Sequence, residues 1–323
     1  MSTGPARAGG TAATPPAALA RPAAAGWRWV LVTAIAPIAW GSYYFVTSHA
    51  LPADSPLWGA AWRALPAGLL LLALSRRLPR GAWWWRSAVL AALNVLGFFT
   101  LAYLAAQLLP SSIVTSVMAL APVALAGFAW ALTGARPTAR FALGAALGIG
   151  GVILVVGITT GGLDWWGVLA ALVAMLLNAI ASVLAQRWAD GPRPIDVVAW
   201  QLAMGGIVLA AAALVVEGAP PPVGWLGVAG YAYVTLVVTG LAYWAWFTGL
   251  AHLPAGTVGI VGLLNPVTGV LLGVLAAGER LGGPQWAGIA LVLVGILIGS
   301  GAVSGRARPG GRRPRPARPS RPR

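Results

Sequence analysis

The sequence predicts an all-α integral membrane protein in which ten transmembrane helices form two inverted five-helix repeats. Three observations lead to this prediction. The chain is 59% hydrophobic and only 8% charged, whereas soluble domains carry about 25% charged residues. It contains ten apolar runs, each long enough to cross the roughly 30 Å hydrocarbon layer of a bilayer. Its two halves also share a pattern of residues at a fixed offset.

The ten apolar runs are bounded by Arg, Pro, Gly or Asp, which interrupt helices or hold their ends at the membrane surface. They lie at 28–47, 57–75, 86–106, 111–132, 140–158, 165–187, 196–216, 225–248, 255–277 and 284–303. Residues 1–27, rich in Ala, Pro and Gly, are expected to be a disordered cytoplasmic arm. Residues 304–323 are expected to be an Arg/Pro-rich cytoplasmic tail.

The arginine residues predict the orientation of the chain. Cytoplasmic loops retain basic residues, and a cytoplasmic N-terminus would place 19 of the 21 basic residues on that side. The exceptions are Arg63 and Arg280. An odd number of helices would move the Arg-rich tail outside. Because the chain uses Arg without Lys and is rich in Ala, Gly and Pro, we expect the plasma (inner) membrane of a bacterium, with both termini cytoplasmic.

An internal repeat divides the chain into 28–158 and 159–303. A shift of 144 residues aligns Pro122-Val123 with Pro266-Val267, and a shift of 138 aligns Ala61-Trp62-Arg63 with Ala199-Trp200-Gln201. Each half contains five helices, an odd number, so the second half must enter the membrane with the opposite orientation. Inverted repeats of this kind are common in secondary transporters.

These residues resemble the EamA-type branch of the drug/metabolite transporter superfamily. The similarity extends over nearly all of 28–303, and the motifs that carry it are Ser55-Pro56 followed by Arg63, Leu109-Pro110 before Pro122, Leu253-Pro254 before Asn265-Pro266, and Gly278-Glu279-Arg280-Leu281. The first half departs from the last motif, because Ala135 stands where the glutamate would be. The resemblance implies an exporter or importer of amino acids, sugars, cofactors or drugs.

We therefore expect a secondary transporter, an exporter of a small metabolite such as an amino acid or a drug-like compound. Helices one to four and six to nine would form two walls that alternate the access of a central site. The alternative is a membrane scaffold or sensor that transports nothing. An enzyme is disfavoured because the chain has no Cys and no Asp, Glu or His deep in a span. No catalytic residues, metal site or cofactor are expected.

Candidate cavity residues follow from polar or helix-breaking residues inside the spans. Pro122 and Pro266 lie at equivalent positions of the repeats, where each removes a backbone donor and kinks its helix. Paired interruptions point to a midplane site, although neighbouring helices could also satisfy such kinks. Asn265 adds an amide beside the second proline.

Arg63 is the one charge inside a predicted span, and intramembrane charges mark function by default. Its alternative is to extend its side chain toward the nearby membrane surface. Its repeat partner, Gln201, is polar but neutral, so the two sides of a cavity would differ in charge.

Further candidates are the deeply placed aromatic and amide residues. Aromatic residues near helix ends usually anchor a span at the membrane surface, and an aromatic pocket would suit amphipathic or cationic metabolites. The candidates of this kind are Trp40, Asn94, Asn178, Tyr243 and Trp244.

The remaining features predict structure and partners. Glu279 and Arg280 are expected to pair or to cap a helix at the outer surface. Small residues four apart, Gly144/Gly148 and Gly295/Gly299, indicate close helix contacts that support the halves or form a homodimer. The Arg-rich tail is expected to contact anionic lipids of the bilayer, and no nucleic acid is expected as a partner.

Overall fold

The computed structural model describes residues 26–134, 137–157, 162–189 and 191–300, and this part of the chain is helical without strands. Six membrane spans are single helices: α1 (Gly26–Ala50), α2 (Pro56–Ser75), α7 (Ala139–Gly157), α8 (Trp165–Arg187), α9 (Pro194–Val216) and α14 (Gly283–Ser300). The predicted arm and tail lie outside the described residues, apart from 26–27.

Four further spans consist of several helical segments. The third joins α3 (Trp83–Leu90), the π-helix η1 (Ala91–Gly97) and α4 (Phe98–Leu108), and the eighth joins α10 (Trp225–Tyr233), the π-helix η2 (Val234–Leu241) and α11 (Ala242–His252). The fourth joins α5 (Ser111–Met118) and α6 (Ala121–Thr133), and the ninth joins α12 (Ala255–Gly262) and α13 (Leu264–Leu275). The prediction of an all-helical membrane protein is confirmed: nine apolar helices in the described part of the chain are long enough to cross a membrane, and a tenth, Gly283–Gly299, is shorter.

The ends of the helices differ from the prediction by a few residues. The third span begins at Trp83 and the eighth continues to His252. His252 lies in the last turn of α11. Its ring stacks on that of Trp29 in α1, with 3.8 Å between the ring centroids. His49 also lies in the last turn of its helix, α1. The predicted runs 28–47 and 225–248 end before these histidines, which would place both in loops, and this was wrong.

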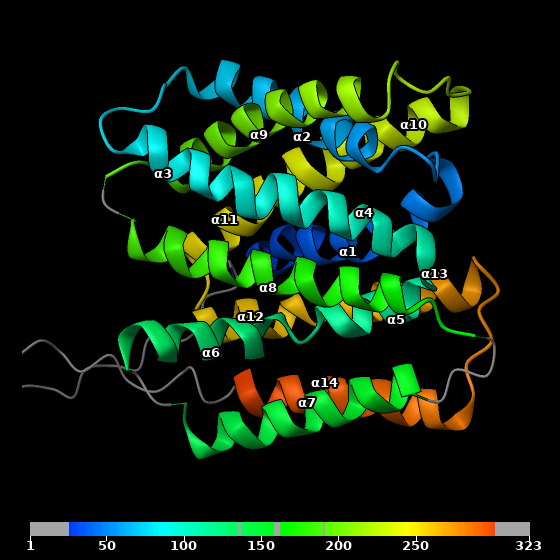
Figure 1. Ribbon diagram of the computed structural model, residues 1–323. Helices are drawn as coiled ribbons and strands as arrows, with labels where there is room; N and C mark the ends of the chain where they lie inside the picture. The colour runs from blue at the N-terminus through cyan, green and yellow to red at the C-terminus, as the bar shows by residue number, and fades with distance from the viewer. Residues whose placement is uncertain (1–25, 135–136, 158–161, 190, 301–323) are drawn as a thin grey trace, which may run out of the picture.

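Successive spans alternate in direction, so the loops gather at two ends of the bundle (Figure 1). We call the end that holds Arg76, Arg77, Arg80, Arg187 and Arg193 the arginine end. The opposite end, which holds Asp54, Asp164, Glu217 and Glu279, is the carboxylate end.

Helices α2 and α9, the second spans of the two halves, cross one another closely. A Cβ atom added to Gly68 would meet the backbone of Ala203, and one added to Gly206 would meet the backbone of Leu65. Residue numbers thus rise along one helix as they fall along the other, so the pair is antiparallel. Because Leu65 and Gly68 are the repeat equivalents of Ala203 and Gly206, each contact is the mirror of the other half's contact.

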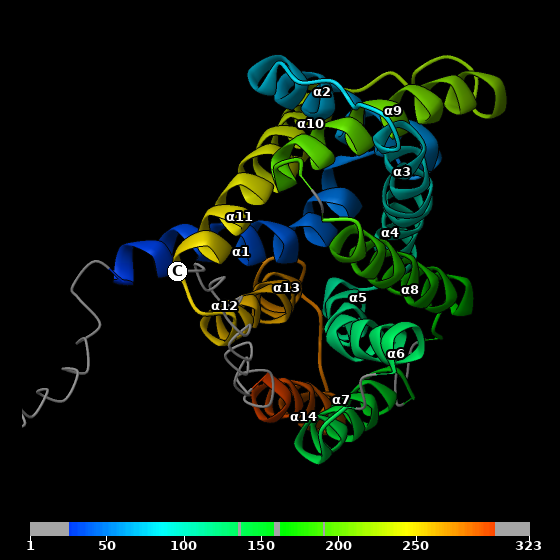
Figure 2. The same ribbon diagram turned by 90° about the vertical axis from the view of Figure 1, so that its left-hand side faces the viewer.

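Helices α7 and α14 repeat this reciprocal arrangement on the opposite side of the bundle from α2 and α9 (Figures 1 and 2). Gly144 lies against Gly295, and Gly151 lies against Gly288. Both halves therefore contribute equivalent residues to an antiparallel pair, as inverted repeats require. These glycines bring two helices of the same chain together, as small residues do in membranes.

The lateral packing differs from the predicted walls of helices one to four and six to nine. Helix α1 packs mainly on α11 and α13, which belong to the second half, and α8 packs mainly on α4 and α6, which belong to the first. The first span of each half is thus exchanged into the opposite wall. The reason is the close approach of α1 to the ninth span, where the backbone oxygen of Asn265 lies against Gly41.

Candidate functional site

A cavity of about 660 Å³ lies between the two halves and is lined by spans from both. Its lining reaches the arginine end at Trp83, Gln186 and Pro192. Toward the carboxylate end, the lining residue of α1 that lies farthest along is Tyr44, six residues before the helix ends. The cavity therefore extends from the middle of the bundle to the arginine end.

Nine of the ten candidate residues from the sequence line this cavity: Trp40, Arg63, Asn94, Pro122, Asn178, Gln201, Tyr243, Asn265 and Pro266. Trp244 does not line it, and half of its surface is exposed on the outside of α11. The placement of Trp244 in the pocket was wrong because its side chain leaves the helix on a different face from that of Tyr243.

The two prolines lie where their spans are broken rather than merely kinked. Pro122 is in the first turn of α6, and Pro266 is the third residue of α13. A proline in a first helical turn removes a donor that would have no intrahelical partner there. Each span therefore ends one helix and begins another at the cavity. Asn265 lies at the second break, and its buried side-chain oxygen has no hydrogen-bond partner among the residues that the structure describes.

Three amide side chains form a connected cluster on one side of the cavity. The Asn178 Nδ2 atom donates to Asn94 Oδ1 at 2.8 Å, and Asn94 Nδ2 donates to Gln201 Oε1 at 3.2 Å. These residues come from α8, η1 and α9. Asn94, which lies in the π-helix η1, is the central residue that bonds to the other two.

A second polar cluster contains the charge. The Arg63 side chain is buried, and its Nε donates to Thr239 Oγ1 at 3.3 Å. The Trp40 Nε1 donates to the backbone oxygen of Val238 at 3.1 Å. Thr239 and Val238 belong to η2, and π-helical segments are frequent at functional sites. The prediction that Arg63 could extend to the membrane surface does not describe this side chain.

The two clusters are related by the internal repeat. The shift of 138 residues that relates Arg63 to Gln201 also relates Trp40 to Asn178. In each cluster these two residues hydrogen-bond to the π-helix of the other half's third span. Asn178 donates to Asn94 of η1 and Gln201 accepts from it, whereas Arg63 and Trp40 both donate to η2. The repeat thus places two clusters at equivalent positions, and they differ in charge: one is cationic and the other is neutral.

Aromatic side chains cover the wall beside Arg63. The Trp40 ring centroid lies 5.9 Å from that of Tyr243 and 5.3 Å from that of Trp246. Tyr43 and Trp246 also line the cavity, and the sequence did not single them out as cavity residues. Their helical spacing could have done so, because Tyr43 follows Trp40 and Trp246 follows Tyr243 by three positions.

Two carboxylates link the two halves at the carboxylate end. Glu279 accepts the N–H groups of Ser111 at 2.6 Å and Ser112 at 3.2 Å, at the start of α5. Glu217, the residue after α9, accepts the N–H groups of Leu57 at 2.7 Å and Trp58 at 3.0 Å, at the start of α2. Both acids occupy helix N-termini, where negative charge is stabilised. Of the two expectations for Glu279, capping describes its contacts. The salt bridges among the described residues do not include Arg280.

Side chains of the third span close the same end from within. Tyr103 is fully buried, and its hydroxyl donates to the backbone oxygen of Pro52 at 2.5 Å. Gln107 Nε2 donates to the backbone oxygens of Thr47 at 2.9 Å and Leu51 at 3.2 Å. The Leu51 and Pro52 oxygens follow the end of α1, where carbonyl groups lack intrahelical donors, and the Thr47 oxygen also accepts the N–H of Leu51 at 3.3 Å.

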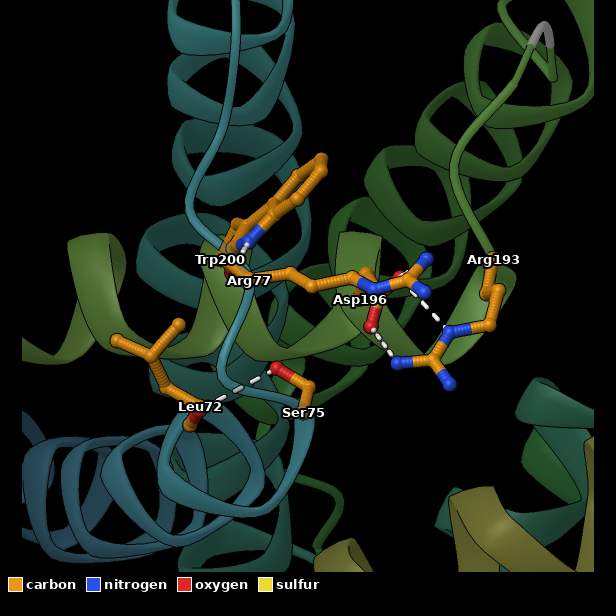
Figure 3. A network of polar contacts seen from close by, with 6 residues as sticks. All are labelled: Leu72, Ser75, Arg77, Arg193, Asp196 and Trp200. Atoms are coloured by element: carbon orange, nitrogen blue, oxygen red, sulfur yellow. Dashed lines mark hydrogen bonds and ion pairs between the residues drawn. The ribbon is translucent and has the colours of Figure 1, made fainter.

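At the arginine end, a polar network connects the halves around Asp196 (Figure 3). The buried Asp196 carboxylate accepts Arg193 Nε at 3.0 Å and Arg193 Nη2 at 2.8 Å, and Arg77 Nη1 lies 3.8 Å away. The Trp200 indole donates to the backbone oxygen of Arg77 at 2.6 Å. The hydrogen bonds with Asp196 raise the pKa of Arg193 above its usual value.

The lining of the cavity is mainly apolar and aromatic, with a few polar side chains among them. Within the described part of the chain, it includes no Asp, Glu or His. Inverted repeats, broken helices and a midplane cavity are together the construction of membrane transport proteins. The fold and the cavity thus define a membrane transporter built from two inverted repeats.

Comparison with known proteins identifies the family. The model of the EamA-like transporter family matches residues 27–157 and again residues 165–300. The chain belongs to this family. The two matches fall on the two halves that the internal repeat separates.

Several relatives are bacterial proteins. Protein PecM of Dickeya dadantii is 34% identical over 81% of this chain and 89% of that protein. The uncharacterized transporter YwfM of Bacillus subtilis is 27% identical over 84% of this chain and 93% of its own length. The uncharacterized inner membrane transporter YedA of Escherichia coli K12 is 27% identical over 81% and 87% of the two chains.

A solved crystal structure shares the fold. It superimposes with a TM-score of 0.61 at 22% identity, and the match covers 84% of this chain and 96% of the other. This likeness supports the arrangement of the helices and not a particular substrate.

Proposed function

We propose that the protein is a secondary transporter that exports a small metabolite across a bacterial plasma membrane by alternating access. The observation that carries this proposal is the cavity between the inverted halves, lined by both helix breaks, Pro122 and Pro266. A volume of about 660 Å³ falls within the range of pockets that hold small molecules.

The arginine end is proposed to face the cytoplasm. Cytoplasmic loops of membrane proteins retain Arg and Lys, and Arg76, Arg77, Arg80, Arg187 and Arg193 lie in or beside loops at this end. The arm and the Arg-rich tail would then be cytoplasmic, with the tail near anionic lipids. In this orientation the cavity is loaded from the cytoplasm, which is the first step of an export cycle.

The helix breaks suggest how access alternates. At the carboxylate end α5 packs on α13, whereas the partner segments α6 and α12 make no contact of comparable extent at the arginine end. Because the repeats are inverted, the same two spans can exchange these roles. Closing α6 on α12 while opening α5 from α13 would turn the cavity to the outside without building a new site.

A reversible lock tests this cycle. Thr115 on α5 lies against Gly269 on α13, and the chain contains no cysteine that would interfere. In the double variant Thr115→Cys/Gly269→Cys, an oxidant should join the two segments, because the added Cβ atoms would lie within reach of a disulfide after a small movement. The cavity would then stay open to the cytoplasm. A reductant would break the disulfide and let the two segments separate again.

The measurement compares metabolites in the medium and the cytosol of cells without the protein, with the wild type and with the lock variant. Wild-type cells should deplete at least one metabolite from the cytosol, and oxidation should abolish this effect in the double variant alone. Each single cysteine variant is the control. A broad screen in which no metabolite changes, repeated in vesicles that contain the purified protein, would overturn the proposed function.

A further inference from the structure

The Arg63 guanidinium is a buried cation in the wall of the cavity. Its side chain is 4% exposed, and the guanidinium carbon lies 4.2 Å from the Tyr43 ring centroid and 3.8 Å from that of Phe99. Its Nε donates to Thr239, while its Nη1 is buried without a hydrogen-bond partner among the described residues. The aromatic faces stabilise a cation but do not neutralise it.

No carboxylate in the described part of the chain pairs with Arg63. Asp196 is the acidic member of both salt bridges there, and its partners are Arg77 and Arg193. The acids Asp54, Asp164, Glu217 and Glu279 lie at the carboxylate end. The cavity lining likewise contains no described acid. A guanidinium remains protonated in proteins, and a buried charge without a counterion is unfavourable. The site therefore carries one positive charge that no acidic residue in the described part of the chain compensates.

The internal repeat indicates that this charge serves the solute rather than the fold. At the equivalent position of the other half, Gln201 makes the equivalent contact with the π-helical segment, through Asn94, and carries no charge. A neutral amide is thus sufficient for packing at this position. The charge of Arg63 is an addition on one side, because the equivalent cluster of the other half consists of neutral amides.

We propose that the transported solute is a small organic anion whose carboxylate binds Arg63 and whose planar or aromatic body lies against Trp40 and Tyr243. This inference rests on the proposed transport function and adds the class of solute. The planar fork of a guanidinium matches a carboxylate with two parallel hydrogen bonds. The amides of Asn94 and Asn178 would contact neutral polar groups at the other end of the solute. The cationic wall disfavours the cationic solutes that the aromatic residues alone suggested.

Matched ligand pairs test the charge requirement directly. The unfolding temperature of the purified protein is measured at increasing concentrations of a ligand, because a bound ligand raises this temperature. The ligands are the sodium salts of phenylacetate, indole-3-acetate and 2-naphthoate, and the corresponding neutral carboxamides. Sodium chloride at the same concentration is the baseline, and phenethylammonium is the cationic comparison. At least one carboxylate should bind about 10- to 100-fold more tightly than its amide, the usual effect of a hydrogen-bonded charge pair. Equal effects of chloride and the carboxylates would overturn the proposal, as would equal binding of acid and amide in every pair.

Variants assign the preference to Arg63. The Arg63→Gln protein should lose the difference between carboxylate and amide, and Arg63→Lys should retain part of it. The matched control is Gln201→Leu in the equivalent position, which should change the binding of both members of a pair by similar factors. A preference that survives in Arg63→Gln would overturn the proposal. The wild-type comparison alone decides the question if Arg63→Gln does not fold.

The same metabolite comparison that tests transport separates the two proposals. Metabolites that the wild-type protein moves should carry a carboxylate, and their movement should be lost in Arg63→Gln. If the metabolites that change are neutral or cationic, the anion proposal fails while the transport function stands. If nothing changes in cells but purified protein still prefers carboxylates, the transport function fails and the binding site stands.

Discussion

The carboxylate of Glu279 accepts the backbone N–H of Ser111 at 2.6 Å, although the two residues belong to opposite halves of the chain. The local backbone makes this contact possible. Gly278 has a φ of 70°, a left-handed conformation that glycine adopts readily, and the N–H of Glu279 donates to Gly273 at 2.9 Å. The chain thus turns back over α13, and the Glu279 side chain passes across Gly273, where a Cβ atom would collide with it.

Replacement of Glu279 by Gln should weaken the closure of the carboxylate end. The Gln side chain has nearly the same shape but only one acceptor oxygen instead of two, and it brings no negative charge to the N-terminus of α5. The expected loss is about 1 kcal/mol, the usual value of a helix cap. Thermal unfolding of the purified protein in detergent should therefore begin at a lower temperature.

The control for this variant is Asp164→Asn. Asp164 caps its own helix, α8, by accepting the N–H of Trp166 at 2.8 Å and that of Gly167 at 3.2 Å, and this bond does not link the halves. Both variants should lose similar stability, but only Glu279→Gln should open the carboxylate end to solvent. If Glu279→Gln changes neither the stability of the protein nor the solvent access at the carboxylate end, the cap does not hold this end closed.

The glycine contacts between α7 and α14 predict a second effect on stability. An alanine at Gly151 would place its methyl group against the backbone oxygen of Gly288, and the two helices would have to move apart. Overpacking of this kind costs about 1–3 kcal/mol. Gly150→Ala is the matched control, because nothing lies within 4 Å of a Cβ there and alanine favours the helix. Unfolding temperatures should fall for Gly151→Ala and stay level or rise for Gly150→Ala.

Much of the fold could be predicted because lipid restricts what the backbone can do. Each span needs its own helix, since peptide groups in hydrocarbon must be hydrogen-bonded within the chain. Apolar runs between Arg, Pro and Gly therefore gave helix ends within a few residues of those observed, and the repeated prolines located the breaks near Pro122 and Pro266. The exchange of α1 into the opposite wall depends on contacts between distant segments, which periodicity does not contain.

The site could be predicted only in part, for a similar reason. Polar residues inside spans identified the lining, but the direction of a side chain depends on its neighbours. Arg63 points inward because Tyr43 and Phe99, from other helices, stack on it. The partner of Glu279 lies 168 residues away, so the sequence could suggest a cap but not which helix it serves.

The contrast between Tyr243 and Trp244 gives a direct test of the cavity wall. These neighbouring aromatic residues are equally deep in the span, but Tyr243 lines the cavity and Trp244 is half exposed on the outer surface. Tyr243→Leu should reduce transport of the exported metabolite several-fold, because solute contacts are lost. Trp244→Leu keeps an apolar side chain on a lipid-facing surface and should transport at the wild-type rate. Equal loss in both variants would place the solute elsewhere.

The direction in which the cavity opens can be measured with single cysteines, because the wild-type chain contains none. Ser182 lines the cavity, whereas Thr47 is fully buried near the carboxylate end and its hydroxyl has no hydrogen-bond partner among the described residues. Cysteine at either position should therefore be tolerated. A membrane-impermeant thiol reagent should label Ser182→Cys in inside-out vesicles and should not label Thr47→Cys from either side, since a thiol must meet water to react.

Adding Glu279→Gln to these variants connects access with the cap. If the Glu279 carboxylate holds α5 and α13 together, its loss should let the outward-facing state become more populated, and a change of about 1 kcal/mol would raise that population roughly five-fold. Thr47→Cys should then react from outside in cells, while labelling of Ser182→Cys from the cytoplasmic side should fall. The two changes must appear together, because one cavity cannot be open at both ends during transport. A rise at Thr47 without a fall at Ser182 would indicate local fraying of the end of α1 and would remove the cap from the alternating-access cycle.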